Sequence, residues 1–500
     1  MNLVQRGLVV AAVAAGVGLR LWPGSPLWLD EAQAVAISSL ALPELLEALR
    51  QDGAPPLYYL VLHAWIRLVG TGTTAVRMLS SCLALAALPL AWRAGGLVGG
   101  RRAAVAALVL FSTSPFALRY ATEARMYALV VLLVLAGVVA VLDPARPRPP
   151  ARLVVIAAVT GGLVLTHYWS FFLLAVVLVA LVLALVTRRG TADAAALAVS
   201  MAAGALAFLP WAPSFWFQLR HTGNPWGSPP GTAAVELAIR GYAGLHSPVT
   251  PALAVVLTGI TGAVLLSRWT DGPSGRSPAP ALAAVALATI VIGALALGIT
   301  GDGFASRHAA VVFPLFLLAV AGGISSLEPA PARSVLLGVT AALALGAGWA
   351  AVTAPRTQAG DIAAILGRRA APGDVVATCP DQLMPALARL LPGTSIDTLP
   401  GANPPGRIDW RDYRARVRAA QPAALAAHLD SQAGAGSVWL VWSPSYAGIE
   451  RQCSRLHREL LRLRPEGRTV LRRKPALLEN AVLWRGPPAP GSLSGAEAGG

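Results

Sequence analysis

The sequence predicts a polytopic, mainly α-helical membrane protein that ends in a small α/β domain. Of its 500 residues, 55% are hydrophobic and 13% are charged, whereas a soluble globular protein carries about 25% charged residues. Apolar stretches of membrane-spanning length recur up to about residue 353, after which charged residues, Pro and Gly increase. We therefore expect a transmembrane domain (1–353), an exterior α/β domain (354–486) and a disordered tail (487–500).

Windows of about 20 apolar residues predict about eleven transmembrane helices. They cover 5–22, 76–93, 102–118, 125–142, 152–166, 169–187, 193–213, 251–268, 280–299, 307–326 and 334–353. The segments 42–50 and 54–70 are shorter and carry polar side chains, so we expect helices that lie in the membrane interface. Arg6 precedes an apolar run from about Gly7 to Leu21, and no cleavage site of small residues follows that run, which favours a retained helix over a removed signal peptide.

Arginine supplies almost all of the positive charge. The formal net charge is +16, and Lys474 is the only lysine. The arginines gather in short loops between apolar stretches, as at Arg101 and Arg102, which is the pattern of cytoplasmic loops in membrane proteins. This distribution argues against a nucleic-acid partner. Eleven crossings from a cytoplasmic N-terminus put the α/β domain outside the plasma membrane.

Alternating helix and strand patterns follow residue 353 and indicate a layered α/β domain. Helices are expected at 358–370, 381–391, 410–429 and 447–464. Strands are expected at 374–378, 438–442, 469–473 and 480–484. Cys379 follows the first strand and Cys453 lies near the start of the last helix. A disulfide between them is an option in an oxidising exterior, and two unpaired buried thiols are the alternative.

Two adjacent carboxylates, Asp30 and Glu31, follow the first apolar stretch. Acids cost several kcal/mol inside hydrocarbon, so we expect the pair at the membrane face or in a polar cavity. Neighbouring acids can have their pKa values pushed apart, which suits one of them to act as a base. A solvated helix end is the simpler explanation of two acids. Trp28 before them and a long, partly apolar loop after them favour a semi-enclosed pocket.

Three other loops on the same predicted side carry ionisable groups. The segment 119–127 has two arginines, whose guanidinium groups fork onto phosphate oxygens, and two tyrosines, which donate hydrogen bonds. An interfacial belt of anchoring side chains would not need its acid, Glu123, which can orient an arginine. The other two loops contain His167, Tyr168, Arg307 and His308. Four such loops on one membrane face favour one site over separate coincidences.

The order of these motifs resembles the GT-C membrane glycosyltransferases, and among them the protein-mannosyltransferase and aminoarabinose-transferase group of family 39. The resemblance covers about residues 1–326. It rests on the Asp-Glu pair, on Pro-Pro-Leu-Tyr-Tyr from Pro55, on Tyr-Ala-Thr-Glu-Ala-Arg-Met-Tyr from Tyr120, and on Thr-His-Tyr from Thr166. Each motif is weak alone, and together they are specific.

The chain also departs from the family pattern at two positions. Ala54 stands where a His often precedes Pro-Pro, and His308 stands where an aromatic residue often follows the late arginine. Both departures concern the identity of the donor or acceptor. The α/β domain, with Cys-Pro-Asp-Gln-Leu from Cys379, resembles the exterior domains of actinobacterial members, which could recognise an acceptor.

The resemblance implies an inverting glycosyltransferase that moves a sugar, such as mannose, from a polyprenyl-phosphate donor to an acceptor hydroxyl at the outer face of the plasma membrane. Asp30 would be the general base, and Glu31 would assist or position it. The residues implied to bind the donor phosphate are Arg119, Tyr120, Glu123, Arg125 and Tyr127. The residues implied to line the cavity are Tyr58, His63, His167, Tyr168, Arg307 and His308.

The expected partners are the lipid-linked donor, a glycan, lipid or protein acceptor, and the bilayer. Because a lipid-phosphate donor is already activated, the reaction requires no cofactor or metal, although the Asp-Glu pair could hold a divalent ion. Two other classes stay open. A transporter or flippase of lipid-linked glycans would place ionisable groups near the bilayer midplane, and a non-catalytic scaffold with an exterior binding domain would leave the acid pair unexplained.

Overall fold

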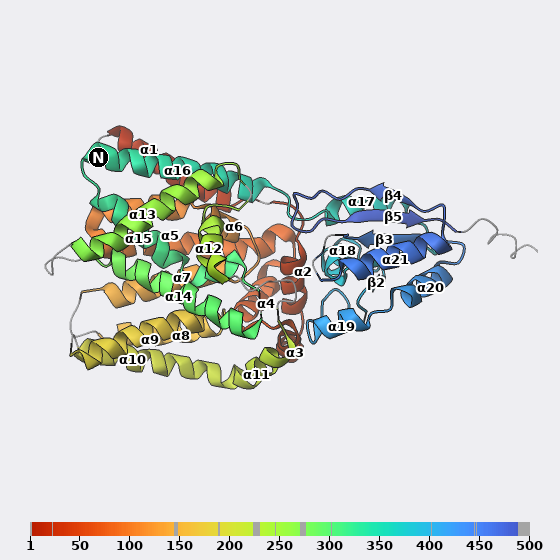
Figure 1. The fold of residues 1–500 in the computed structure, drawn as a ribbon, viewed down its shortest axis with the longest axis horizontal. Coiled ribbons are helices and arrows are strands. Elements are labelled where there is room, and N and C mark those ends of the chain that lie inside the picture. The colour runs from red at the N-terminus through yellow and green to blue at the C-terminus, as the bar shows by residue number, and fades with distance from the viewer. Residues whose placement is uncertain are drawn as a thin grey trace, which may run out of the picture. The chain divides into compact units, whose positions relative to one another are not determined.

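The chain forms two compact units in the computed structural model, whose elements Figure 1 labels. The model describes residues 3–22, 24–144, 149–188, 191–223, 231–245, 247–270, 277–301, 303–401, 403–444, 446 and 448–488. The helical unit comprises Met1–Pro23, Ala54–Trp216 and Gly227–Thr353, and the α/β unit comprises Gly24–Gly53, Phe217–Trp226 and Ala354–Gly500.

The boundaries expected for the domains stay a prediction, and the compact units divide the chain differently in two respects. Residues 24–53, which carry the acid pair, belong to the α/β unit, and so do residues 217–226. The tail expected at 487–500 lies outside the described residues from position 489 onward.

Helices build the first unit, and every predicted transmembrane stretch falls on them. They are α1 (Leu3–Arg20), α4 (Leu57–Val69), α5 (Thr73–Thr113), α6 (Pro115–Ala121), α7 (Tyr127–Leu142), α8 (Pro150–Val164), α9 (Ser170–Val186), α10 (Thr191–Ala205), η1 (Leu206–Trp211), η2 (Gly231–Ala233), α12 (Ala234–Tyr242), α13 (Thr250–Thr270), α14 (Ala279–Thr300), η3 (Ser306–Val311), α15 (Phe313–Ser326) and α16 (Ala330–Thr353). Helix α11 (Ala212–His221) contains the boundary between the two units.

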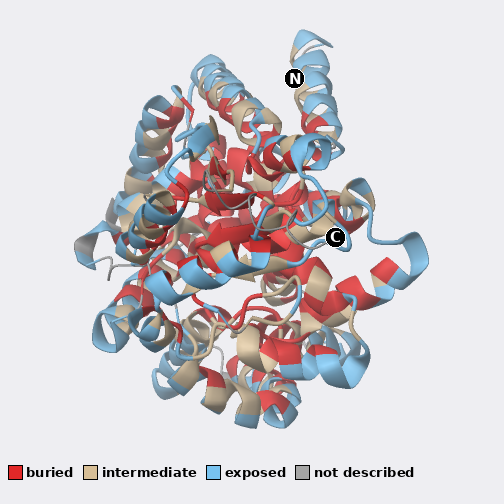
Figure 2. Ribbon diagram, turned by 90° about the vertical axis from the view of Figure 1, so that its right-hand side faces the viewer, coloured by how far each residue is buried: buried red, intermediate tan, exposed pale blue. Residues whose placement is uncertain are grey.

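Within the described residues, six helical segments are long and apolar enough to cross a bilayer. They are Leu3–Arg20, Thr73–Thr113, Ala192–His221, Thr250–Ser267, Ala279–Thr300 and Ala330–Thr353. Helices α4, α7, α8, α9 and α15 are also apolar but shorter. Exposed residues are pale blue in Figure 2. Large apolar side chains such as Val186 and Ile299 are exposed, and a bilayer is the solvent that favours such exposure. The chain is therefore a multi-pass membrane protein.

Helix α5 joins two stretches that the sequence analysis predicted as separate helices. Its backbone leaves the helical conformation at Gly99 and Gly100, so the two arms correspond to the predicted stretches. Gly100 has a φ of 67°, a left-handed conformation that costs glycine little and other residues more. A Cβ on Gly95 would lie 2.7 Å from the carbonyl oxygen of Ala103, so the absence of a side chain lets the arms approach closely.

A buried arginine donates hydrogen bonds to the C-terminal end of α5. Arg20, at the end of α1, donates from Nη1 to the carbonyl oxygen of Ser112 at 2.7 Å and from Nη2 to that of Phe111 at 2.5 Å. These carbonyls lie in the last turn of α5, where no amide within the helix can reach them. The Arg20 guanidinium group therefore links the end of α1 to the last turn of α5 by donating hydrogen bonds to carbonyls that need them.

The second unit is built around a five-stranded sheet with the order β2-β1-β3-β5-β4. Its strands are β1 (Val375–Cys379), β2 (Ile396–Thr398), β3 (Val438–Trp442), β4 (Arg468–Leu471) and β5 (Val482–Gly486). Strand β1 runs parallel to β2 and β3, whereas β5 runs antiparallel to β3 and β4. The four predicted strands are confirmed, and β2, only three residues long, is additional.

The helices of this unit are α2 (Leu29–Ser38), α3 (Leu42–Asp52), α17 (Ala359–Arg369), η4 (Asp381–Leu383), α18 (Met384–Leu390), α19 (Tyr413–Ala419), α20 (Pro422–Ala433) and α21 (Glu450–Leu463). The single helix expected at 410–429 was wrong, since two helices meet at Pro422. Proline has no amide hydrogen and cannot continue a helix, but it fits at a first turn. Helix α2 was not predicted.

Apolar side chains cover both faces of the sheet. Ala377, Leu440 and Trp484 belong to one buried core, and Val376, Trp439 and Leu483 belong to the other. Trp28 and Leu29, which begin α2, belong to the first of these cores. The segment that carries the acid pair is therefore an integral part of the α/β unit.

Candidate functional site

The helical unit holds two arginines in fixed orientations. Arg125 lies in the turn between α6 and α7, and its Nη1 donates to the hydroxyl of Tyr59 on α4 at 3.1 Å. Arg119 lies in the last turn of α6, with its Nε 3.5 Å from Oε2 of Glu123. The Glu123 side chain is 1% exposed, so a buried acid orients one guanidinium group and a buried hydroxyl orients the other. Guanidinium groups held in this way suit a phosphate ligand.

Aromatic rings connect this turn to two other predicted loops. The ring centroids of Tyr120 and Tyr127 lie 4.4 Å apart, those of Tyr127 and His167 lie 5.8 Å apart, and those of His167 and His308 lie 6.3 Å apart. The charges of Arg125 and Arg307 both act on His167. Together with Arg119 and Glu123, these residues form what we call the arginine–histidine cluster. Its eight members are Arg119, Tyr120, Glu123, Arg125, Tyr127, His167, Arg307 and His308.

The two histidines of this cluster are held by the same local device. Nδ1 of His167 accepts the backbone N–H of Trp169 at 3.2 Å, and Nδ1 of His308 accepts that of Ala305 at 3.2 Å. With Nδ1 as an acceptor, a neutral imidazole carries its proton on Nε2. Each ring therefore keeps one N–H donor whose direction is set by its own turn.

Three further residues predicted to line the cavity lie on α4 and in the turn before α9. Tyr58 is buried on α4 and lies edge-on to Tyr59 with ring centroids 6.0 Å apart. His63 is buried on the same helix. Tyr168 accepts a hydrogen bond from Trp211 Nε1 at 2.9 Å and packs against the ring of Phe215. The role of Tyr58 stays a prediction. Its neighbour Tyr59, which was not predicted, contacts Arg125, and adjacent helical residues point about 100° apart.

Asp30 and Glu31 occupy the first turn of α2, in the α/β unit. Acidic side chains at this position interact favourably with the helix dipole. The Glu31 side chain is fully buried, and its Oε2 lies 3.6 Å from Nη1 of Arg356. Asp30 is only half-buried. The two acids are thus in different environments, one buried beside a cation and the other partly exposed.

A third acid, Glu479, contacts the start of α2 although it lies far from α2 in the sequence. Glu479 is buried, and its Oε2 accepts the backbone N–H of Leu29 at 3.3 Å. Burial raises the pKa of the Glu479 carboxyl to about 8, and the charge of Asp30 acts in the same direction. Arg356 and Glu479 were not predicted from the sequence, because no local pattern links them to residues 29–31.

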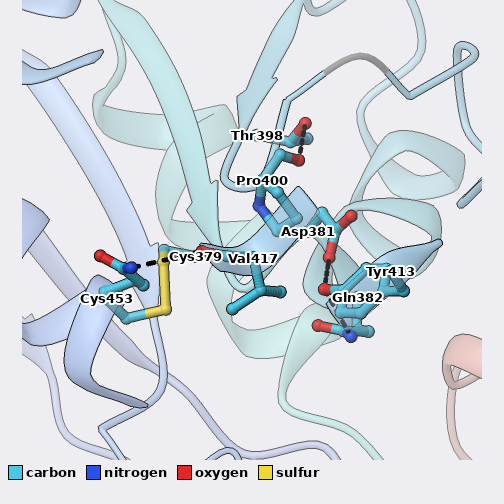
Figure 3. The surroundings of a disulfide bond; sticks show 9 residues. Cys379, Asp381, Gln382, Thr398, Pro400, Tyr413, Val417 and Cys453 are labelled. Carbon is cyan, nitrogen blue, oxygen red and sulfur yellow. Dashed lines mark hydrogen bonds between the residues drawn. A yellow bond between two sulfur atoms is a disulfide. The ribbon is translucent and has the colours of Figure 1, made fainter. Parts of the chain in front are cut away.

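The end of β1 carries a disulfide and a buried carboxyl group (Figure 3). Cys379 and Cys453 are bonded, with an S–S distance of 2.11 Å, which joins β1 to α21. Two residues further on, Asp381 accepts hydrogen bonds from the Tyr413 hydroxyl at 2.5 Å and from Nδ2 of Asn403 at 2.7 Å. Burial raises the pKa of Asp381 to about 7, although both hydrogen bonds oppose the change.

Among the described residues, no group of three or more His, Cys, Asp or Glu side chains is arranged to hold a metal ion.

No family model and no curated protein matches the sequence. Two solved structures match nearly the whole chain. ArnT from Cupriavidus metallidurans bound to undecaprenyl phosphate is 16% identical with a TM-score of 0.60, over 97% of this chain and 98% of that chain. The apo state of the same protein is 16% identical with a TM-score of 0.59, over 95% and 97% of the two chains. The chain thus has the fold of the GT-C membrane glycosyltransferases, as its motifs predicted.

Proposed function

We propose that the protein is a glycosyltransferase that moves a sugar from a polyprenyl-phosphate donor to an acceptor hydroxyl. The arginine–histidine cluster, found in a chain with the GT-C fold, is the observation that carries this proposal. Its oriented guanidinium groups fit a phosphate ester, and the similar structure of ArnT has undecaprenyl phosphate bound. We further propose that the sugar is mannose and that transfer takes place at the outer face of the plasma membrane.

The cluster would act on the leaving group. When the bond between the anomeric carbon and the phosphate oxygen breaks, negative charge develops on the phosphate. Arg125 and Arg119 would stabilise this charge, and fixed donors of this kind act most strongly where charge develops in the transition state. Because Tyr59 and Glu123 already hold the two guanidinium groups, little reorganisation is needed as the bond breaks.

Asp30 would accept the proton of the acceptor hydroxyl. Its partly exposed carboxylate suits a base, whereas Glu31 is buried next to Arg356. The acceptor oxygen forms a bond to the anomeric carbon as the phosphate leaves on the opposite side, and the hydroxyl proton passes to Asp30. One such displacement inverts the configuration at the anomeric carbon.

The test uses the full-length protein in membranes with labelled polyprenyl-phosphate mannose, and the same lipid carrying other sugars. We expect transfer in the wild type, a loss of at least about 100-fold in Asp30→Asn, and a loss of about 100- to 1,000-fold in Arg125→Met. Arg368→Met, an exposed substitution on α17, is the control and should leave transfer unchanged.

Two outcomes would contradict the proposal. Unchanged transfer in Asp30→Asn would remove the base assignment. A wild-type protein that transfers no sugar from any polyprenyl-phosphate donor would favour a transporter or a non-catalytic scaffold, and movement of the intact labelled lipid between leaflets would identify the transporter.

A further inference from the structure

Helix α2 lacks a side-chain cap of its own. Its N-cap residue is Trp28, and no side chain of the local sequence accepts a hydrogen bond from the first amides of the helix. The first amides of a helix need acceptors from outside it. Glu479 supplies one, since its Oε2 lies 3.3 Å from the amide nitrogen of Leu29. A residue from the last strand region of the α/β unit therefore caps the helix on which Asp30 lies.

A second contact holds the next residue of that helix. Glu31, which follows Asp30, lies beside Arg356, and the two side chains are 0% and 6% exposed. Arg356 is itself tied to the cap, because the backbone N–H of Glu479 donates to its carbonyl oxygen at 3.0 Å. Arg356 and Glu479 are therefore joined by a backbone hydrogen bond, and the side chains of both contact the first turn of α2.

A third contact fixes the rotation of the helix. Gln33 is 3% exposed, and its side chain exchanges two hydrogen bonds with the backbone of Ile408, at 3.0 Å and 2.9 Å. A helix held at its N-terminal amide, at Glu31 and at Gln33 has little freedom to slide or rotate. Asp30 lies between the first two of these points and is the partly exposed member of the turn.

We infer that Arg356 and Glu479 are positioning residues, which hold the first turn of α2 so that Asp30 keeps its reactive orientation. This inference rests on the proposed role of Asp30 as the base. On this view the α/β unit contributes directly to the transfer reaction, because the helix turn that carries the base belongs to it.

The test compares Glu479→Met, Glu479→Gln and Arg356→Met in the full-length protein in nanodiscs. Arg369→Met, an exposed substitution at the end of α17, is the matched control. We expect kcat to fall by about tenfold to a hundredfold in Glu479→Met and Arg356→Met, as for small displacements of a catalytic group. The KM for the donor should stay within about twofold, because the phosphate-binding arginines do not change.

Glu479→Gln should keep most of the activity. Its amide oxygen can still accept the N–H of Leu29, so the cap survives without the carboxyl group. The double variant Glu31→Gln with Arg356→Met should lose no more kcat than the worse single variant, because both substitutions break one interaction.

Hydrogen exchange gives a readout that does not depend on transfer. The amides of Leu29–Ser38 should exchange about fivefold faster in Glu479→Met, whereas those of β3 keep their protection. If β3 also loses protection, Glu479→Gln decides: near-normal kcat with a protected α2 supports the inference, and a loss equal to that of Glu479→Met overturns it.

The failure of this inference differs from the failure of the proposed function. Wild-type kcat and unchanged exchange of α2 in both methionine variants, together with an inactive Asp30→Asn, would overturn the positioning role and leave the function intact. If the wild type transfers no sugar, the proposed function fails and, with it, the role of Asp30 on which the inference rests. The exchange data would then report only how α2 is anchored.

Discussion

The α/β unit should lose stability as the pH rises from about 4 to 7, and Asp381 should cause a defined part of that loss. Its carboxyl group is 0% exposed. Burial disfavours the charged form and raises the pKa of the group from 3.8 to about 7, although Tyr413 and Asn403 donate hydrogen bonds that favour the carboxylate. The perturbation is the pH itself, and Asp381→Asn is the variant that no longer titrates.

The size of the effect follows from the two pKa values. Each pKa unit corresponds to about 1.4 kcal/mol, so the change from 3.8 to about 7 corresponds to about 4 kcal/mol. Because the folded state holds the proton more tightly than the unfolded state, the stabilisation is complete below pH 3.8. It is lost progressively as the pH rises and is gone once the pH passes about 7. A domain is stabilised by only about 5–15 kcal/mol in total, so the loss is measurable.

Hydrogen exchange of the β1 and β3 amides, corrected for intrinsic rates, measures the free energy of opening at each pH. Glu479 has a raised pKa as well and contributes in the same direction, so the difference between the wild type and Asp381→Asn isolates the contribution of Asp381. Tyr413→Phe removes a donor to the carboxylate and should extend the decline to higher pH. Parallel pH profiles for the wild type and Asp381→Asn would refute the reasoning.

Three further predictions concern the same unit. Arg464 is 1% exposed and donates to Asp430 and to backbone carbonyls, so Arg464→Met should lower the free energy of opening by about 3–5 kcal/mol, measured by the same exchange experiment. A Cβ at Gly436 would lie 2.4 Å from the carbonyl oxygen of Gly373. Gly436→Ala should therefore cost about 1–3 kcal/mol, visible as a lower denaturation midpoint. Cys379→Ser opens a disulfide across 74 positions, which should cost about 2–5 kcal/mol and change the mobility on a non-reducing gel.

Membrane-length helices and the turns between them could be predicted from the sequence because both depend on local properties. The length of an apolar stretch decides whether it can span a bilayer. The turn that contains His167 follows from the polar residues between two apolar stretches, and it lies between α8 and α9 as expected. The same local logic predicted the buried strand β3, since an apolar run of five residues is typical of a covered strand.

Other features depend on contacts between distant residues, and no local pattern predicts those. Strand β2 is three residues long and exists because β1 offers a free edge. The contact between Tyr59 and Arg125 depends on which side of α4 faces that arginine. Pro422, by contrast, is a local signal, because proline ends one helix and begins the next, and it was enough to divide the helix expected at 410–429.

The acid pair shows why two equal side chains in a sequence can have unequal roles in a structure. Replacing a buried ion pair by apolar residues of similar volume is often neutral for stability, because desolvation offsets the attraction between the charges. The contact between Glu31 and Arg356 therefore explains little of the stability of the unit. What it supplies is direction, because a charge pair has one favourable geometry and an apolar contact has many. A turn that must present Asp30 in one orientation benefits from that property. The double variant Glu31→Gln with Arg356→Met should therefore lower kcat with little change in the melting temperature, whereas Arg356→Met alone leaves the buried Glu31 without its cation and should lower both.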